Sequence, residues 1–311
     1  MKVFLINPGM VDDYVYYLAS GLSSQKIKIH NIGSNNYENK ELNFLNTNYY
    51  DHFFAVNNIK SEAIKRIAKV FLYIFLQFLI VKKIRDERPD IIHMQWSRMP
   101  VIDSLFVRFF RKRASVIFTL HNTTLNHGDI SIPLKILNLG FKSFLKSVDT
   151  IIVHTKYSRE KFVNDFPEFK DKVSIIDHGL LDFPATKNKN FNFPIKDEKI
   201  ILFFGNIEKY KGIDVLIEAL GEIKDENFKL LVAGRAQMDI SILKKAAIRL
   251  GIEKKIIWNT SFIDERDVSE IFNISDLIVL PHRHIDQSGV LMTAINFSKP
   301  IIASNIGGFS E

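Results

Sequence analysis

The sequence predicts an α/β protein built from two tandem doubly wound domains that face each other across a crevice. The first observation is the length of 311 residues, which exceeds that of most single domains. The second is that short apolar runs, typical of buried strands, alternate with amphipathic helical segments in both halves of the chain. The third is a stretch rich in Pro, Lys and Asn without periodicity, which predicts a linker at 181–198 between domains at 1–180 and 199–311.

The first domain is expected to contain a parallel sheet. Apolar runs between turn residues predict strands at 2–6, 27–32, 91–95, 115–120, 150–154 and 174–176. Helical periodicity predicts helices that begin at Asp12, Ser61 and Val101, with one more helix before the fifth of these strands. Residues 33–58 show no clear period, and we expect a loop there. Because helices separate the strands, the connections should be right-handed crossovers.

The second domain repeats this alternation. Strands are expected at 200–204, 229–233, 255–258, 277–280 and 300–303, and helices at 214–223, 240–250 and 267–274. In the first of these helices the expected core residues are Val215, Leu216, Ala219, Leu220 and Ile223. In such domains ligands bind at the carboxyl ends of the strands, so the loops after the strands are the first place to look for a site.

The composition and the absence of several motifs narrow the function. The chain has no cysteine, which excludes disulfides and thiolate metal sites. It contains no DxD, HExxH, GxSxG or Walker lysine motif, so we expect neither a metal nor another cofactor, and hydrolase or kinase activity lacks support. The start of the chain reads as a strand and not as a signal peptide.

The net charge of +7 allows nucleic acid, phosphorylated substrates or an anionic membrane as partners. Nucleic-acid binding is not expected, because no basic stripe is interleaved with aromatic residues outside the helices. The apolar run at 70–81 is flanked by lysines and arginines and is shorter than the ~20 residues of a membrane span. It favours a buried helix; the alternative is a helix that also contacts a membrane surface.

Two loops of the second domain suit a phosphate group. The stretch at 280–294 ends a strand and starts a helix at Ser288 and Gly289, and a helix start offers free N–H groups and a positive dipole end. The loop at 205–212 has a glycine at each end and brings Lys209 and Lys211 to the same edge of the sheet. Each alone could be an ordinary N-cap or a solvated loop, and the prediction rests on their sum.

In the first domain, Gly9 lies at the first strand–helix turn, but no GxGxxG dinucleotide motif is present. His121 directly follows a buried strand and is a candidate for substrate contact or proton transfer. The alternative is a histidine that is hydrogen-bonded to the backbone of a loop. His93 is expected to have a structural role within the sheet. His127, His154 and His178 are weaker candidates.

Taken together, these segments resemble a known family. The matching segments are HMQW at 93–96, LHN at 120–122, HG at 178–179, FFGNIEKYKGIDVLIEA at 203–219, VAGRA at 232–236, SDLIVLPHR at 275–283, QSGVLMTA at 287–294 and KPIIASNIGGFSE at 299–311. Over nearly its whole length the chain resembles retaining glycosyltransferases of family 4, which have the GT-B fold of two Rossmann-like domains. The resemblance implies metal-independent transfer of a sugar from a nucleotide diphosphate sugar, such as a UDP- or GDP-sugar, to an acceptor hydroxyl.

The resemblance also assigns site residues. The donor diphosphate would be bound by Gly9, Asn206, Lys209, Lys211, Ser288, Gly289, Val290 and Leu291. Arg235 and Thr293 would lie near the nucleoside, His121 near the transferred sugar and Trp96 near the acceptor. In this family the departing phosphate oxygen is usually drawn as assisting the acceptor hydroxyl, which fits a chain without a paired-carboxylate nucleophile.

Three departures from the family pattern stand out. Two glutamates spaced eight apart are replaced by Ile285, next to Asp286, and by Thr293, where a glutamate commonly holds the ribose. Asn206 stands where an arginine is common, and Arg235 or Lys209 would have to compensate. The family usually continues beyond the position of Glu311, so we expect the second domain to be truncated.

These observations leave three functions open. The first is a cytoplasmic glycosyltransferase of surface polysaccharide or glycan synthesis, acting on a glycan or lipid-linked acceptor, with peripheral attachment to an anionic inner membrane surface as an option. The second is a non-catalytic relative that binds a nucleotide sugar or a partner. The third is a nucleotide-sugar epimerase of the same fold, which would need no acceptor.

Overall fold

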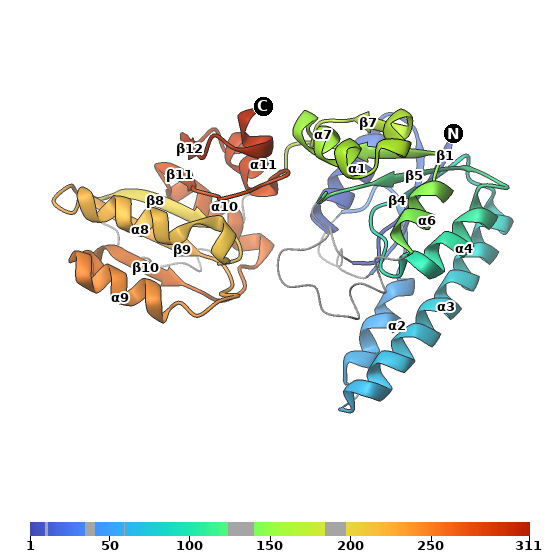
Figure 1. The fold of residues 1–311 in the computed structure, drawn as a ribbon, viewed down its shortest axis with the longest axis horizontal. Coiled ribbons are helices and arrows are strands. Elements are labelled where there is room, and N and C mark those ends of the chain that lie inside the picture. Colours follow the sequence, from blue (N-terminus) through green and yellow to red (C-terminus); the bar gives the residue numbers. More distant parts are fainter. Residues whose placement is uncertain (10–11, 35–40, 59, 124–139, 184–196) are drawn as a thin grey trace. The chain divides into compact units, whose positions relative to one another are not determined.

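The structure is a computed structural model that describes residues 1–9, 12–34, 41–58, 60–123, 140–183 and 197–311. The chain divides into two compact units, Met1–Gly179 and Leu180–Glu311, and each is described here by itself. Each unit contains its own parallel sheet with helices on both faces (Figure 1). Most of the predicted linker at 181–198 lies outside the described residues.

The sheet of the first unit has seven parallel strands in the order β3-β2-β1-β4-β5-β6-β7. Its strands are β1 (Lys2–Ile6), β2 (Lys28–Ile32), β3 (Leu45–Thr47), β4 (Ile91–Met94), β5 (Ser115–Thr119), β6 (Thr150–Val153) and β7 (Val173–Ile175). The six predicted strands are therefore confirmed to within a few residues. The strand order reverses between β1 and β4, and in doubly wound sheets ligands bind at such a reversal.

The helices of this unit pack on both faces of the sheet. They are α1 (Asp12–Ser24), α2 (Tyr49–Ala55), α3 (Glu62–Glu87), α4 (Pro100–Phe110), α6 (Phe141–Ser147) and α7 (Lys156–Asp165), with short 3₁₀ segments η1 (Val56–Asn58) and η2 (Pro167–Lys172). Along β1, Phe4 and Ile6 face the core that contains residues of α3, α4 and α6, whereas Val3 and Leu5 face the core formed with α1. A strand that is apolar on both sides is typical of a sheet covered on both faces.

The prediction of a loop at 33–58 is wrong. The described part of that segment contains β3, α2 and η1. β3 has only three residues and pairs with β2, and α2 is fixed by Tyr50, which is buried against Tyr73 of α3 with ring centroids 6.4 Å apart. These elements depend on tertiary partners distant in sequence, so local periodicity did not reveal them.

α3 begins where the sequence predicts, with Ser61 as N-cap accepting a hydrogen bond from the N–H of Ile64. It ends before Pro89, and Arg88 has a left-handed backbone with φ of 48°. The expectation that the run at 70–81 is buried holds for only one side of this helix. Tyr73, Leu76 and Ile80 are buried, but other apolar residues of the run are exposed. No helix among the described residues is long and apolar enough to cross a membrane.

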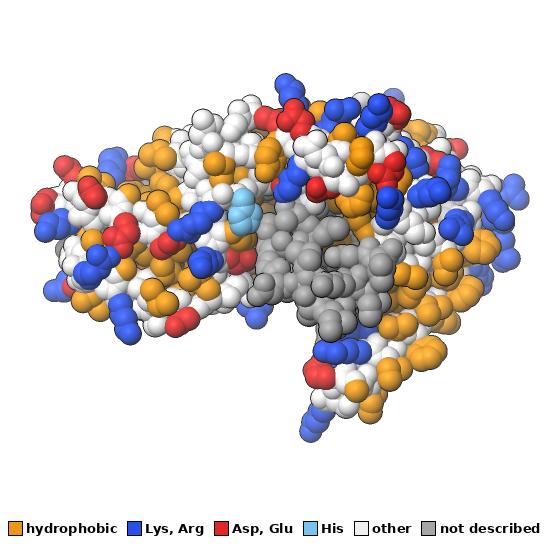
Figure 2. Space-filling view, in the orientation of Figure 1, with side chains coloured by type: hydrophobic (Ala, Val, Ile, Leu, Met, Phe, Trp, Pro, Cys, Tyr) orange, Lys and Arg blue, Asp and Glu red, His pale blue; other side chains and the backbone are white. Residues whose placement is uncertain are grey.

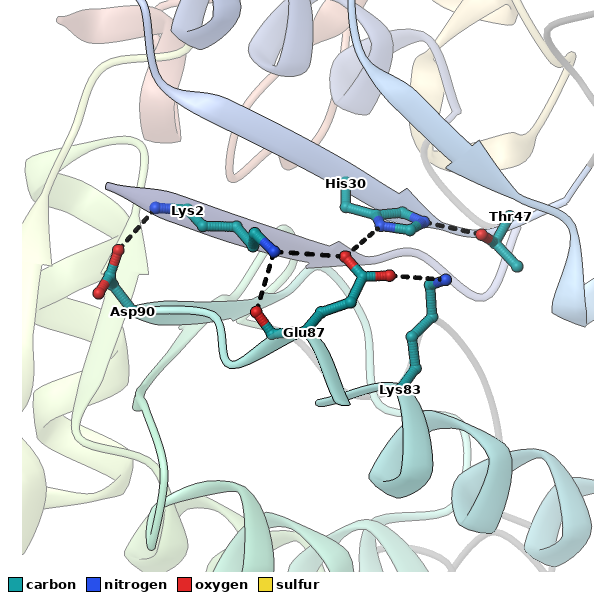
Figure 3. A network of polar contacts seen from close by, with 6 residues as sticks. All are labelled: Lys2, His30, Thr47, Lys83, Glu87 and Asp90. Atoms are coloured by element: carbon teal, nitrogen blue, oxygen red, sulfur yellow. Dashed lines mark hydrogen bonds and ion pairs between the residues drawn. The ribbon is translucent and has the colours of Figure 1, made fainter. Parts of the chain in front are cut away.

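A polar network fixes the C-terminal end of α3 to the sheet (Figure 3). The Glu87 carboxylate lies 2.9 Å from Lys83 Nζ, 3.2 Å from His30 Nδ1 and 3.5 Å from Lys2 Nζ. His30 Nε2 lies 2.7 Å from Thr47 Oγ1, so the network also joins β2 to β3. A cavity of 740 Å³ lined in part by Lys2, His30 and Glu87 lies at this N-terminal edge of the sheet, away from the strand ends predicted to bind ligand.

The second unit has a five-stranded parallel sheet in the order β10-β9-β8-β11-β12. Its strands are β8 (Lys199–Phe204), β9 (Phe228–Ala233), β10 (Ile256–Asn259), β11 (Leu277–Leu280) and β12 (Ile301–Ala303). Its helices are α8 (Ile213–Glu222), α9 (Ser241–Leu250), α10 (Glu265–Ile274) and α11 (Gly289–Asn296), with 3₁₀ segments η3 (Lys209–Lys211), η4 (Glu253–Lys255) and η5 (Gly307–Ser310). All five predicted strands are confirmed, and the order reverses between β8 and β11.

The predicted core face of α8 is only partly correct. The buried residues of this helix are Ile213, Leu216, Ile217 and Leu220, a spacing of three, one and three that matches one helical face. Of the other predicted core residues, Val215 is 49% exposed and Ile223 46% exposed, and Ala219 is also exposed. The prediction failed because it began the helix one residue late and so left Ile213 out of the pattern.

Candidate functional site

Three loops of the second unit meet at the C-terminal edge of its sheet. They follow β8, β9 and β11, and β8 and β11 are the neighbouring strands at which the order reverses. Two glycines allow these loops to pack backbone against backbone. Gly212 has φ of 69°, and a Cβ atom there would lie 1.9 Å from the carbonyl oxygen of Pro281. Gly234 has φ of 149°, and a Cβ atom there would lie 2.2 Å from the carbonyl oxygen of Gly205.

Lys211 is the buried cation of this edge. Its side chain comes from η3, and the residue is only 9% exposed. A Cβ atom added to Gly205 would lie 2.9 Å from Lys211 Nζ and 3.5 Å from Val290 Cγ2, so the ammonium group lies beside Gly205 and the first turn of α11. Burial lowers the pKa of Lys211, while Glu208 partly offsets that effect. Within the described residues, no carboxylate lies within ion-pair distance of its Nζ atom.

The first turn of α11 presents N–H groups at the same place. Ser288 is the N-cap, and its Oγ accepts a hydrogen bond from Leu291 N at 3.2 Å. Among the residues that the structure describes, none accepts a hydrogen bond from the N–H of Gly289 or Val290. A buried ammonium group beside open helix N–H groups forms an anion-binding arrangement.

Sequence reasoning missed Arg283, which connects two of the three loops. Its guanidinium group donates bidentate hydrogen bonds to the Asp214 carboxylate at 2.8 and 2.6 Å and a third to the carbonyl oxygen of Lys209 at 2.8 Å. Its backbone N–H donates to the carbonyl oxygen of Tyr210 at 2.7 Å. Arg283 thereby holds the loop after β11 against η3 and positions Lys211. Arg283 was visible in the sequence as the last residue of the matched segment at 275–283. Its contact with Asp214 could not be predicted, because the two residues are far apart in the chain.

The remaining residues predicted for the donor have other surroundings. Asn206, Lys209 and Arg235 are exposed at the same loops. Thr293 is only 3% exposed, and its hydroxyl group donates to the carbonyl oxygen of Gly289 at 2.9 Å. The hydroxyl that replaces the family's glutamate is therefore bonded within its own helix.

A cluster of imidazole rings lies in the first unit, at the C-terminal ends of its strands. Tyr14 of α1 is at the centre, with ring-centroid distances of 4.8 Å to His121, 5.2 Å to His154 and 5.0 Å to His178. The three histidines follow β5, β6 and β7, and we call these four residues the Tyr14 cluster. Of the candidates that the sequence ranked below His121, His154 lies beside His121, His178 lies beside His154, and His127 lies outside the described residues.

Hydrogen bonds fix the orientation of these rings. His121 Nε2 lies 3.3 Å from Gln95 Oε1, so within the described residues its ring is bonded to a side chain and not to the loop backbone. His93 lies within β4, as expected, and its Nε2 lies 2.7 Å from Thr119 Oγ1. Two buried nitrogen atoms, Gln95 Nε2 and His154 Nε2, have no hydrogen-bond partner among the described residues. Buried polar atoms of this kind usually form hydrogen bonds with water or with a ligand.

The environment of the Tyr14 cluster and of His93 favours neutral imidazoles. Burial lowers the pKa of His93 and of His154 to about 4, and it lowers the pKa of His121 well below its usual value. Burial also lowers the pKa of His178, and it raises that of Tyr14 to about 12. At neutral pH these side chains therefore act as hydrogen-bonding groups without charge.

Trp96 and Gly9 lie at neighbouring strand ends. The Trp96 ring is stacked on His121, with centroids 6.3 Å apart and planes 18° apart. Gly9 has φ of 74°, and the adjacent carbonyl oxygen of Pro8 accepts two hydrogen bonds from the Arg98 guanidinium group, at 2.9 and 2.6 Å. In the parts of the chain that the structure describes, no group of three or more His, Asp or Glu residues is placed to hold a metal ion.

Comparison with known proteins identifies relatives of both units. The family described as Glycosyltransferase Family 4 matches residues 11–180, and the one described as Glycosyl transferases group 1 matches residues 185–311. The chain is 27% identical over 270 residues to the O-antigen biosynthesis glycosyltransferase WclY of Escherichia coli, covering 84% of this chain and 70% of that protein.

Two further relatives are matched over shorter stretches. An uncharacterized glycosyltransferase of Methanocaldococcus jannaschii is 28% identical over 171 residues, which are 52% of this chain and 43% of that protein. The GDP-mannose:glycolipid 4-beta-D-mannosyltransferase of Xanthomonas campestris is 26% identical over 139 residues, which are 44% of this chain and 37% of that protein. In both cases the matched part is less than half of the relative.

Solved structures share the fold. Sucrose-phosphate synthase from Thermosynechococcus elongatus has a TM-score of 0.70 at 15% identity, covering 99% of this chain and 82% of that one. Anabaena HepE, solved in complex with UDP and glucose, has a TM-score of 0.66 at 15% identity, covering 100% of this chain and 82% of that one. At this level of identity the similarity establishes the arrangement of the elements alone.

Proposed function

The chain belongs to glycosyltransferase family 4, and we propose that it transfers a sugar from a nucleotide diphosphate sugar to an acceptor hydroxyl group. The observation that carries this proposal is Lys211, a buried ammonium group without a carboxylate partner among the described residues, beside the open N–H groups of α11. Burying an unpaired charge is costly, so such a site is best satisfied by a bound anion. A diphosphate supplies that negative charge, and its oxygen atoms accept hydrogen bonds from the N–H groups at the same time.

The reaction that fits these residues is a metal-independent transfer with retention of configuration. The bond from the sugar C1 atom to the diphosphate oxygen breaks, and the acceptor oxygen forms a bond to C1 on the same face. The acceptor proton passes to the departing phosphate oxygen, so no side chain has to take it. Lys211 and the N–H groups of Gly289 and Val290 stabilise the negative charge that develops on the diphosphate.

The Tyr14 cluster and its neighbours would contact the sugar and the acceptor. Neutral His121 can hydrogen-bond a sugar hydroxyl group without a charge change, and Gln95 and His154 each have a buried nitrogen atom available. The Trp96 ring offers a flat apolar surface on which a sugar ring could lie.

The donor is proposed to be a UDP- or GDP-sugar. HepE, which shares the fold, was solved with UDP and glucose, and a relative from Xanthomonas is named for GDP-mannose. WclY is named for O-antigen biosynthesis, which supports a role in surface polysaccharide or glycan synthesis. We further propose that the protein is located in the cytoplasm and acts on a glycan or lipid-linked acceptor. It would be attached to an anionic membrane surface.

Calorimetric titration of the purified chain with UDP, GDP and their sugars tests the donor site. We expect one of the two nucleotides to bind, and Lys211→Ala to weaken that binding by roughly tenfold or more. Lys224→Ala, which changes an exposed lysine of the same unit, is the matched control and should bind as the wild type does. Equal binding by both variants, or no binding of either nucleotide by the wild type, would refute the proposed site.

A further inference from the structure

α3 and α4 of the first unit together expose a continuous band of large apolar side chains, which we call the α3–α4 stripe. Its members are Ile64, Ile67, Phe71, Phe75 and Phe78 on α3 and Val101, Leu105 and Phe109 on α4. Phe71 is 71% exposed, and Phe75 and Phe78 are 57% and 60% exposed. Figure 2 shows hydrophobic side chains gathered over these two helices. Contiguous exposed apolar surface of this extent marks an interaction site.

The stripe is straight and belongs to one side of each helix. Its α3 members recur at intervals of three and four residues, which keeps them in line along the helix. Since a helix rises about 1.5 Å per residue, the line from Ile64 to Phe78 is about 20 Å long. The Phe78 ring contacts the buried Phe106 ring edge-on, with centroids 5.1 Å apart, and this contact joins the two helices.

The opposite side of α3 is fixed, so the helix cannot rotate to bury the stripe. Tyr73, Leu76 and Ile80 are buried in the core, and the Tyr73 hydroxyl group donates to Asp103 of α4 at 2.7 Å. The network around Glu87 holds the C-terminal end of α3 to β1 and β2 (Figure 3). The exposed aromatic rings are therefore a constant feature of the folded unit.

Cations border the stripe. Lys82 and Arg85 follow Phe78 at helical spacing on the same side of α3, and both are exposed. On α4, Arg108 lies next to Phe109, and Lys112 Nζ lies 5.6 Å from the centroid of the Phe109 ring. The sequence from 63 to 85 contains no Asp or Glu. Apolar side chains bordered by Lys and Arg are typical of helices that lie in a membrane interface, with the cations among the headgroups.

We propose that the α3–α4 stripe inserts into the interfacial layer of an anionic lipid bilayer, with its rings among the acyl chains and its cations on the lipid phosphates. The inference rests on the proposed membrane attachment and specifies which surface makes it and how. A second copy of the chain fits the stripe less well, because a symmetric dimer would place the Lys and Arg side chains that border one stripe against those that border the other. Anionic lipid complements both the apolar and the basic parts.

Co-sedimentation of the full chain with vesicles tests the inference. Vesicles of phosphatidylcholine with phosphatidylglycerol should bind the wild type more strongly than vesicles of phosphatidylcholine alone. The double variant Phe71→Ser/Phe75→Ser should bind the anionic vesicles roughly tenfold more weakly or worse. Phe262→Ser removes a ring of the second unit that is 78% exposed, and it should leave binding unchanged.

Two outcomes would overturn the inference: no binding to anionic vesicles by the wild type, or equal binding by the wild type and the double variant. A wild-type dimer in sedimentation velocity that the double variant abolishes, without vesicle binding, would identify a second copy as the occupant instead. Calorimetry with the nucleotide in the absence of lipid is the separating measurement. The double variant should bind nucleotide as the wild type does. Loss of membrane binding with intact nucleotide binding therefore concerns the stripe alone, and loss of nucleotide binding concerns the donor site.

Discussion

At the scale of single residues, Lys211 combines a stability cost with a proposed role in binding the donor. Its ammonium group is desolvated, no carboxylate among the described residues lies within ion-pair distance of it, and the more distant Glu208 offsets the effect of burial only in part. A folded state that holds such a group is less stable than one with an apolar side chain of similar length, and the proposed diphosphate would reduce this difference on binding. Stability and donor binding therefore oppose each other at this position.

Replacing Lys211 by Met should accordingly stabilise the unliganded protein by about 1–2 kcal/mol, because no charge remains to be buried. The nucleotide that binds the wild type should raise its unfolding temperature and have little effect on the variant. Thermal unfolding with and without nucleotide measures both effects. A variant that is less stable than the wild type and keeps the full nucleotide-induced shift would contradict this account of the site.

The buried histidines make stability depend on pH. His93 and His154 have pKa values of about 4 in the folded chain and about 6.5 when unfolded, so the unfolded state binds more protons between these values. Their contribution to stability is complete above the unfolded pKa and is lost as the pH falls from about 6.5 to 4. Asp103, whose pKa burial raises to about 6, has the opposite effect and reduces this slope.

Urea unfolding at pH 7.5 and 5 should therefore show a loss of roughly 2 kcal/mol for each of these two histidines at the lower pH. His154→Gln should remove one titrating group and flatten the dependence. Stability that stays constant or rises toward pH 5 would show that these imidazoles are not held neutral in the fold.

His121 is the residue of the Tyr14 cluster expected to matter most for transfer. Its ring is held by Gln95 and stacked on Trp96, so its position is fixed before any substrate arrives. His121→Ala should lower kcat for sugar transfer by about 100-fold or more and leave nucleotide affinity within a factor of about two, because nucleotide binding is proposed to depend on Lys211 and α11. Transfer assays and calorimetry on the same preparation measure the two quantities, and unchanged kcat would remove His121 from the site.

At the scale of elements, the loops after β8 and β11 depend on Gly212. Its φ of 69° and the position of the Pro281 carbonyl oxygen exclude a side chain. Gly251 provides a matched comparison, because it has φ of 73° but open space where a Cβ atom would lie. The two positions share the backbone strain and differ only in the steric clash.

Gly251→Ala should cost about 1 kcal/mol of unfolding free energy from backbone strain alone. Gly212→Ala should cost at least ~2 kcal/mol more and also weaken nucleotide binding, because the loop that carries Lys211 must shift. Chemical unfolding and calorimetry of the two variants give the comparison. If the two variants lose similar amounts of unfolding free energy, the loop that contains Pro281 can move away from the new side chain at position 212.

At the scale of the whole molecule, the net charge of +7 and the α3–α4 stripe would contribute to the proposed membrane binding in different ways. The electrostatic part is screened by salt, with a Debye length of about 10 Å at 0.1 M, whereas apolar insertion is not. The ratio between the two parts decides how steeply binding falls with ionic strength.

Raising the salt concentration should therefore weaken the binding of the wild type to anionic vesicles without abolishing it. The Phe71→Ser/Phe75→Ser variant, which retains the cations, should lose its remaining binding at high salt. Vesicle sedimentation across a salt series measures this, and wild-type binding that disappears as completely as that of the variant would assign the attachment to charge alone.

The sequence by itself determined the alternation of strands and helices, the two sheets and the sheet edge at which the candidate site lies. Buried parallel strands and helix starts are encoded locally, in short apolar runs and in residues such as Ser61 and Ser288, and periodicity reveals them. The glycines and Lys211 were also visible in sequence, because a loop that follows a parallel strand has a known place in the fold.

The tertiary structure alone decided which side chains meet. Tyr14 joins three histidines that follow three different strands, Arg283 bonds Asp214 across 69 positions, and β3 and α2 form only against partners distant in sequence. It also decided that half of α3 faces outward. Contacts of this kind depend on how the elements pack. A local pattern of residue types shows that a helix is amphipathic, but it does not show whether another element covers its apolar face.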